Sequence, residues 1–109
     1  MKSPLFIFDD REQYVLAEKG KLKIMIVIDK NAWKQNITLI EILIPEQSGL
    51  EHDLYSLQTL ELKESEGWIY VSFEWFEHFK ELLKILQDRG WKINQKILEQ
   101  LESYSLERL

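Results

Sequence analysis

The sequence contains no cysteine, and this absence excludes three classes of protein. Without thiols the chain has no disulfide framework, no thiolate metal site and no cysteine nucleophile. Glycine and proline are also scarce, with four and two copies in 109 residues. The glycines are too widely separated for a phosphate-binding loop, and no GxSxG motif occurs. The sequence therefore lacks these common signatures of catalysis.

Long apolar runs are absent as well. No segment approaches the roughly 20 apolar residues of a membrane span, and the apolar run at residues 5–8 is too short for a signal peptide. We therefore expect a cytoplasmic protein with no membrane partner. The composition is that of an ordinary globular protein, 45% hydrophobic and 30% charged. The length predicts a single domain over residues 1–109.

The net charge of −5 is unevenly distributed along the chain. Residues 1–50 are balanced, so the whole acidic excess lies in residues 51–109. Because phosphate backbones repel an acidic domain, we expect no nucleic-acid partner. The same charge favours docking on a basic protein surface.

The first two thirds of the chain read mainly as strands, because β-branched and aromatic residues cluster between turn signals. The run Ile24–Ile28 is apolar at every position, which predicts a strand covered on both faces. A single helical turn is expected near Glu51–Tyr55. The expected strands are residues 5–8, with 13–17 as a second strand or its continuation, then 22–29, 36–44, 57–63 and 68–73.

Helical spacing of apolar residues dominates the rest of the chain and predicts helices over residues 74–89 and 95–104. Gly90 fits the position after the first helix, and Asn94 fits the N-cap of the second. A turn over residues 91–93 joins them. Together these patterns predict an α+β fold, with a mainly antiparallel β-meander of about five strands followed by two C-terminal helices on one sheet face. The expected core face of the first helix is Trp75, Phe76, Phe79, Leu82, Leu83 and Leu86.

One short segment, Glu51-His52-Asp53, combines an imidazole with carboxylates in an expected loop. A histidine oriented by a carboxylate can act as a general base. The side chains of adjacent residues point in different directions, however, so we expect this segment to be an ordinary solvated loop. The segment remains the ligand site of an alternative hypothesis, a small enzyme or ligand-binding sensor. The spacing of the two histidines matches no metal motif, and we expect no metal and no cofactor.

The outer face of the first expected helix carries an acidic ridge, formed by Glu74, Glu77, Glu81 and Asp88. These four residues fall within an arc of roughly 60°. Such a ridge can dock on a basic partner. Alternatively, it can be an ordinary solvated face on which Lys80 and Lys84 relieve the repulsion between the carboxylates.

Four tryptophans are many for this length. Trp33 and Trp91 lie in expected connections, where a large ring either covers the core or serves as an exposed contact for a partner. Trp75 is assigned to the core by its helical spacing.

The leading hypothesis is a small acidic protein–protein interaction module, an inhibitor, immunity or antitoxin-type regulator or an accessory subunit. Its expected contacts are Glu74, Glu77, Glu81, Asp88, Trp33 and Trp91. A homo-oligomeric structural protein, such as a homodimer that buries spare strand surface, is a further alternative.

Overall fold

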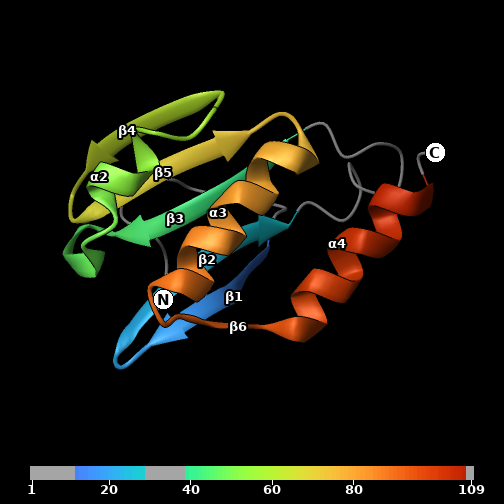
Figure 1. The fold of residues 1–109 in the computed structure, drawn as a ribbon, viewed down its shortest axis with the longest axis horizontal. Helices are drawn as coiled ribbons and strands as arrows, with labels where there is room; N and C mark the ends of the chain where they lie inside the picture. The colour runs from blue at the N-terminus through green and yellow to red at the C-terminus, as the bar shows by residue number, and fades with distance from the viewer. Residues whose placement is uncertain (1–11, 29–38, 108–109) are drawn as a thin grey trace.

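The computed structural model describes residues 12–28 and 39–107, which form an antiparallel sheet covered by helices (Figure 1). The six strands of this described part are β1 (Glu12–Lys19), β2 (Leu22–Ile28), β3 (Ile40–Pro45), β4 (Glu61–Ser65), β5 (Trp68–Phe73) and β6 (Lys92–Ile93). Its helices are the short η1 (Glu46–Ser48) and α2 (Glu51–Leu54), and the longer α3 (Phe76–Asp88) and α4 (Gln95–Glu107).

The strands follow the order β4-β5-β3-β2-β1-β6, and every neighbouring pair is antiparallel. Two hairpins, β1–β2 and β4–β5, lie on either side of β3. Gly20 turns the first hairpin with a φ of 61°, a conformation that glycine adopts without steric cost. The predicted α+β fold with an antiparallel sheet is thereby confirmed, with six described strands in place of about five.

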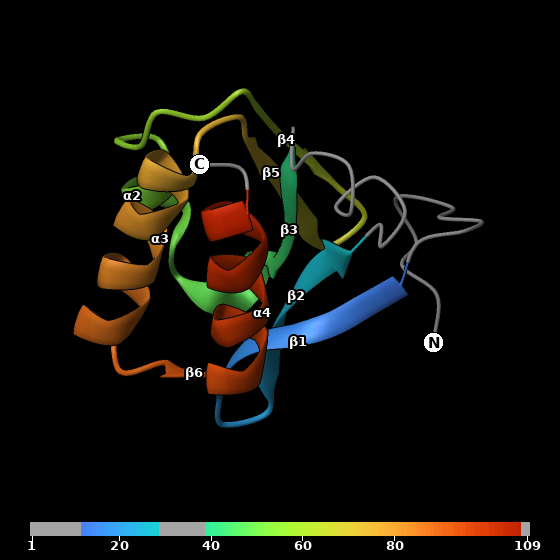
Figure 2. The same cartoon turned by 90° about the vertical axis from the view of Figure 1, so that its right-hand side faces the viewer.

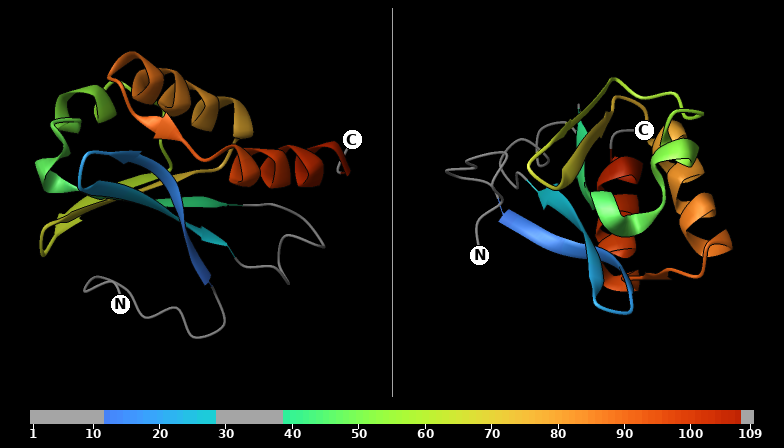
Figure 3. Two further views of the ribbon diagram at one scale, coloured as in Figure 1. Left: turned by 90° about the horizontal axis from the view of Figure 1, so that it is seen from below. Right: turned by 90° about the vertical axis from the view of Figure 1, so that its left-hand side faces the viewer.

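The two long helices lie on the same face of the sheet (Figures 2 and 3). Each contributes a buried apolar stripe to the core. From α3 the buried residues are Phe79, Leu82 and Leu86, and from α4 they include Ile97 and Leu101. Alternate residues of the central strands meet them, because successive side chains point to opposite faces. These sheet residues include Ile24, Ile26, Ile42, Ile44, Ile69, Val71 and Phe73.

The opposite face of the sheet is also buried at its centre. Val27 is 2% exposed, Leu43 is fully buried, and Tyr70 and Ser72 are buried beside them. The prediction that the apolar run of β2 is covered on both faces is therefore confirmed at Val27. Burial on both faces explains why β2 and β3 read as nearly continuous apolar runs.

A β-bulge interrupts β1 and fixes the start of α4. Val15 pairs with Met25 and Ala17 with Ile24, so Leu16 is the extra residue. The backbone N–H of Asn94 donates to the Leu16 carbonyl over 2.8 Å, and its side-chain amide donates to the Val15 carbonyl over 2.9 Å. Asn94 Oδ1 accepts a hydrogen bond from the Lys96 N–H, which confirms the predicted N-cap.

Several predicted boundaries change. Residues 91–93 are not a simple turn, because Lys92–Ile93 pairs with β1 as an additional edge strand. The strand expected from residue 57 begins only at Glu61. The helix expected from residue 74 begins at Phe76. The strand expected at residues 5–8 and the start of the strand expected at 36–44 lie outside the described residues.

Candidate functional site

A bend of two residues, Glu74-Trp75, joins the end of β5 to the start of α3. Trp75 is the N-cap residue, with an extended backbone (φ −115°, ψ 134°) and no side-chain capping hydrogen bond. The direction of its indole therefore does not follow the helical spacing from which a core position was predicted. Trp75 is 62% exposed, so its assignment to the core was wrong.

Three large apolar side chains are exposed within the described part of the chain: Tyr55, Leu60 and Trp75. Leu60 is 58% exposed and Tyr55 is 66% exposed. Fully burying a large apolar side chain contributes about 1.5–3 kcal/mol, and at these three positions folding realises only part of that free energy. Tyr55 follows α2, and its hydroxyl lies 3.4 Å from the Glu64 carboxylate. The charge of Glu64 raises the pKa of the Tyr55 hydroxyl above its ordinary value.

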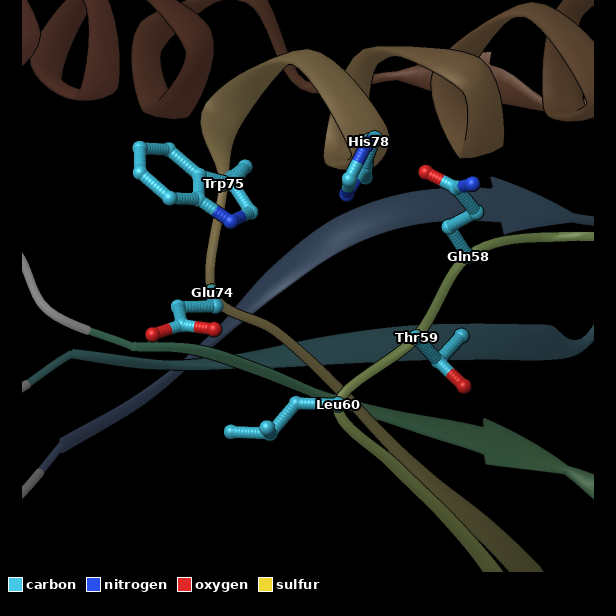
Figure 4. A pocket seen from close by; sticks show the side chains of 6 residues that line it. All are labelled: Gln58, Thr59, Leu60, Glu74, Trp75 and His78. Carbon is cyan, nitrogen blue, oxygen red and sulfur yellow. The ribbon is translucent and has the colours of Figure 1, made fainter.

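Leu60 and Trp75 line an open cleft at the start of α3 (Figure 4). The β4–β5 hairpin brings the walls of the cleft together at the end opposite its turn. At this end the Leu60 N–H donates to the Ser72 carbonyl over 2.8 Å. The cleft has a volume of about 190 Å³. Its lining residues are Gln58, Thr59, Leu60, Glu74, Trp75 and His78.

The side chains of Leu60, Glu74 and Trp75 extend toward the same side of the cleft, whereas His78 points from α3 into the space between Trp75 and Gln58 (Figure 4). Glu74 is exposed, and no described residue forms an ion pair or hydrogen bond with its carboxylate. The ring of Trp75 likewise has no aromatic or cationic neighbour among the described residues. The cleft thus presents an uncovered aromatic face beside an unpaired negative charge.

The predicted acidic ridge is altered by this helix boundary. Glu74 precedes α3 and lines the cleft, so it does not continue the ridge. Glu77, Glu81 and Asp88 are exposed on the helix. The helical spacing also places Lys84 on this stripe, and its ammonium group lies 3.6 Å from the Glu81 carboxylate. The expected relief of the ridge by Lys84 is thus present at Glu81, whereas Glu74, Glu77 and Asp88 have no ion-pair partner among the described residues.

The segment Glu51-His52-Asp53 forms most of the short helix α2. Glu51 and His52 are exposed. Asp53 is mostly buried and accepts a hydrogen bond over 3.0 Å from Arg89 Nη2, at the end of α3. Asp53 thus makes a structural ion pair between two helices. Neither described cleft is lined by these three residues.

The other two expected tryptophan contacts differ from the prediction. Trp91 is 4% exposed and belongs to the core, so it covers the core and offers no ring to a partner. Trp91 is held in the core because the next two residues form β6, which pairs with β1. Trp33 lies outside the described residues.

A buried polar group lies on the sheet face opposite the helices. The Tyr70 hydroxyl donates to Glu41 Oε1 over 2.8 Å. Burial raises the pKa of Tyr70 well above its ordinary value, and the hydrogen bond and charge of Glu41 raise it further. The neighbouring Ser72 lowers the pKa of Tyr70, but by a smaller amount. Among the described residues the buried hydroxyl of Ser72 makes no full hydrogen bond. A tyrosine held protonated in this way is structural and is a poor proton donor at neutral pH.

A second cleft of about 280 Å³ lies where β1, β6 and α4 meet. It is lined by Val15, Glu18, Lys92, Ile93, Asn94 and Gln95. Asn94 is already engaged in holding the bulge, and Lys92 and Glu18 bring opposite charges. This cleft therefore has neither an exposed aromatic ring nor a dominant charge.

Within residues 12–28 and 39–107, no group of three or more histidine and acidic side chains is arranged to hold a metal ion. In the same residues no helix has both the length and the apolar content needed to cross a membrane. Comparison with protein-family models, with curated proteins and with solved structures found no match to this chain.

Proposed function

We propose that this protein is a small, cytoplasmic protein–protein interaction module that docks on a basic partner surface through the Trp75 cleft. In this role it acts as an inhibitor, immunity or antitoxin-type regulator or as an accessory subunit. The observation that carries the proposal is the exposure of Trp75, at 62%, beside the Glu74 carboxylate, which has no partner in the described part of the chain. Tryptophan is enriched among the residues that dominate binding energy at protein interfaces.

The size of the cleft favours a protein partner over a metabolite. Pockets for small molecules and cofactors usually enclose about 300–1,000 Å³, whereas this cleft holds about 190 Å³ and is open to solvent. It is large enough for one side chain of a partner. Two of its lining residues, Leu60 and Trp75, are exposed apolar side chains that a partner could cover.

Charge supports a basic partner. The sequence carries −5 overall, and within residues 12–28 and 39–107 neither Glu74 nor Glu77 has an ion-pair partner. A complementary surface would accelerate association and make it sensitive to salt.

The test is affinity capture from cells of the native source, with the bound proteins identified by mass spectrometry and the complex rebuilt from purified components. We expect one stoichiometric partner whose affinity falls with salt. Trp75→Ala should weaken the rebuilt complex by about tenfold or more, as expected for a central interface residue.

A charge-matched control separates the cleft from the general acidity of the protein. Glu74→Lys and Glu99→Lys change the net charge equally, but Glu99 lies on α4. We expect Glu74→Lys to disrupt the complex and Glu99→Lys to leave it nearly unchanged. Equal binding by the wild type, Trp75→Ala and Glu74→Lys would eliminate the proposed docking surface.

A further inference from the structure

The chemistry of the Trp75 cleft specifies more than a basic partner, and the following inference rests on the proposed function. Its walls combine one indole ring, one carboxylate and the aliphatic side chain of Leu60. We infer that the cleft binds a single arginine side chain of the partner, with the guanidinium stacked on Trp75 and paired with Glu74.

The indole ring is the first part of this site. A cation over the face of tryptophan is attracted by the negative charge of the π system, and tryptophan is the strongest of the aromatic residues in this respect. The protein's own lysines already occupy two other rings: Lys80 lies 5.3 Å from the centre of Phe76, and Lys63 lies 5.3 Å from the centre of Tyr70. Among the described residues no cation covers Trp75, so its face is open to one from outside.

The carboxylate of Glu74 is the second part. It extends to the same side as the indole of Trp75 (Figure 4) and has no ion-pair partner among the described residues. A planar guanidinium can stack on a ring and donate two parallel hydrogen bonds to a carboxylate at the same time. The compact ammonium of lysine cannot make both contacts in this way and loses more hydration, which favours arginine.

The N-terminus of α3 contributes a positive electrostatic field, which opposes the binding of a cation in the cleft. A helix N-terminus carries roughly half a positive charge and therefore disfavours a nearby cation. Glu74 and Glu77 place two full negative charges at the same end of the helix. The carboxylates therefore dominate the field in the cleft. His78 on α3 also lines the cleft, and Lys80 lies against the ring of Phe76.

The occupant also has to fit the space. About 190 Å³ accommodates several water molecules or one long side chain. Leu60 provides apolar surface for the methylene groups of arginine, which bury readily against such side chains. Gln58 and Thr59 close the far wall.

The experiment is a nuclear magnetic resonance titration of the purified wild-type protein with three blocked tripeptides, Gly-Arg-Gly, Gly-Lys-Gly and Gly-citrulline-Gly. Citrulline has nearly the shape of arginine but no charge. The readout is the indole N–H resonance of Trp75, assigned by its loss in Trp75→Phe. We expect a saturable shift with arginine, a response about threefold to fivefold weaker with lysine, and no saturable shift with citrulline.

Two variants sharpen the result, and both change exposed residues, so the fold should be retained. Glu74→Gln should weaken arginine binding by about threefold to fivefold, as for an exposed ion pair. Glu99→Gln, the matched control on α4, should leave it unchanged. Equal responses to arginine and citrulline, a linear response to all three peptides, or a Trp68 resonance that moves as much as that of Trp75 would each overturn the inference.

This outcome is separable from the fate of the proposed function. If the tripeptides fail but Trp75→Ala still releases the captured partner, then the docking surface stands and the arginine inference falls. If no partner depends on Trp75, then the docking function itself is rejected.

Discussion

Arg89 and Asp53 form an ion pair, with 3.0 Å between Nη2 and Oδ1, that ties the end of α3 to the short helix α2. The Asp53 side chain is 18% exposed and that of Arg89 is 58% exposed, so the pair is partly shielded from solvent. Lys19 adds a second tie at the same place, because its ammonium group donates to the Arg89 carbonyl over 2.7 Å. The segment proposed from the sequence as a ligand site therefore supports the position of α3.

Removing this ion pair should cost a modest part of the stability. We expect Arg89→Ala to lower the free energy of unfolding by about 0.5–1 kcal/mol, near the upper end for ion pairs of this exposure. The measurement is urea denaturation. Lys84→Ala breaks the more exposed pair with Glu81, whose side chains are 71% and 57% exposed, and serves as the control, for which we expect almost no change. A loss with Lys84→Ala as large as that with Arg89→Ala would contradict the structural role of Asp53.

Alkaline pH should destabilise the protein through Tyr70. Its pKa is raised in the folded state by burial and by Glu41, above an unfolded value of about 10. The folded state therefore holds this proton more tightly, so its contribution to stability is complete below pH ~10 and is lost as pH rises toward the folded pKa. Urea midpoints measured between about pH 8 and pH 11 should fall.

In Tyr70→Phe this alkaline fall should be smaller, because the group that titrates is gone. Tyr55→Phe is the control, since Tyr55 is exposed and the charge of Glu64 is the main cause that raises its pKa. An identical alkaline fall in the wild type and in Tyr70→Phe would show that other groups govern it.

Asn94 should be sensitive even to a good capping replacement. Asn94→Ala removes the bonds to the Val15 carbonyl and the Lys96 N–H, and we expect a loss of about 1–2 kcal/mol in thermal or urea unfolding. Aspartate caps helices as well as asparagine does, but it cannot donate to Val15. Asn94→Asp should therefore also destabilise the protein. Wild-type stability in Asn94→Asp would mean that the bond to the bulge contributes little.

Trp75 and Phe79 should differ sharply in their effect on stability. Phe79 is fully buried and lies in edge-to-face contact with Phe73, with ring centres 5.9 Å apart. We expect Phe79→Ala to cost about 3–5 kcal/mol, whereas Trp75→Ala should stay within about 0.5 kcal/mol of the wild type. Calorimetry of both variants checks this. A large loss with Trp75→Ala would return Trp75 to the core.

The strands and helices were predictable where a strong period of apolar residues coincides with burial. The β-branched run of β2 and the helical spacing of Phe79, Leu82 and Leu86 are such cases, and their burial confirms the prediction. Gly20 and Gly67, which lie between consecutive strands, both have positive φ, as the turns of the two hairpins require.

The start of α3 was misread because a helical wheel cannot detect where the helix begins. Trp75 has the right spacing from Phe79, yet its backbone is extended, and an exposed ring was therefore assigned to the core. The strand β6 was missed for a different reason. Two residues are too few to show any period, and they form a strand only because β1 supplies the pairing partner.

The cleft itself combines residues that are distant in the sequence. Leu60 and Glu74 become neighbours because they flank a hairpin, one just before β4 and the other just after β5. The expected strands at residues 57–63 and 68–73 contained this information, since antiparallel pairing of two consecutive strands brings their outer ends together. What the sequence could not supply was the exposure of Leu60 and Trp75, which depends on where the helices lie.

The pairing of β6 with β1 has a consequence for the order in which the protein is made. Ala17 meets Ile93, so the bulged strand completes its sheet only after the ribosome has released nearly all of the described chain. Until then the backbone edge of β1 is open to pairing with other nascent chains. Chaperone protection of this open edge during synthesis should therefore raise the yield of the protein.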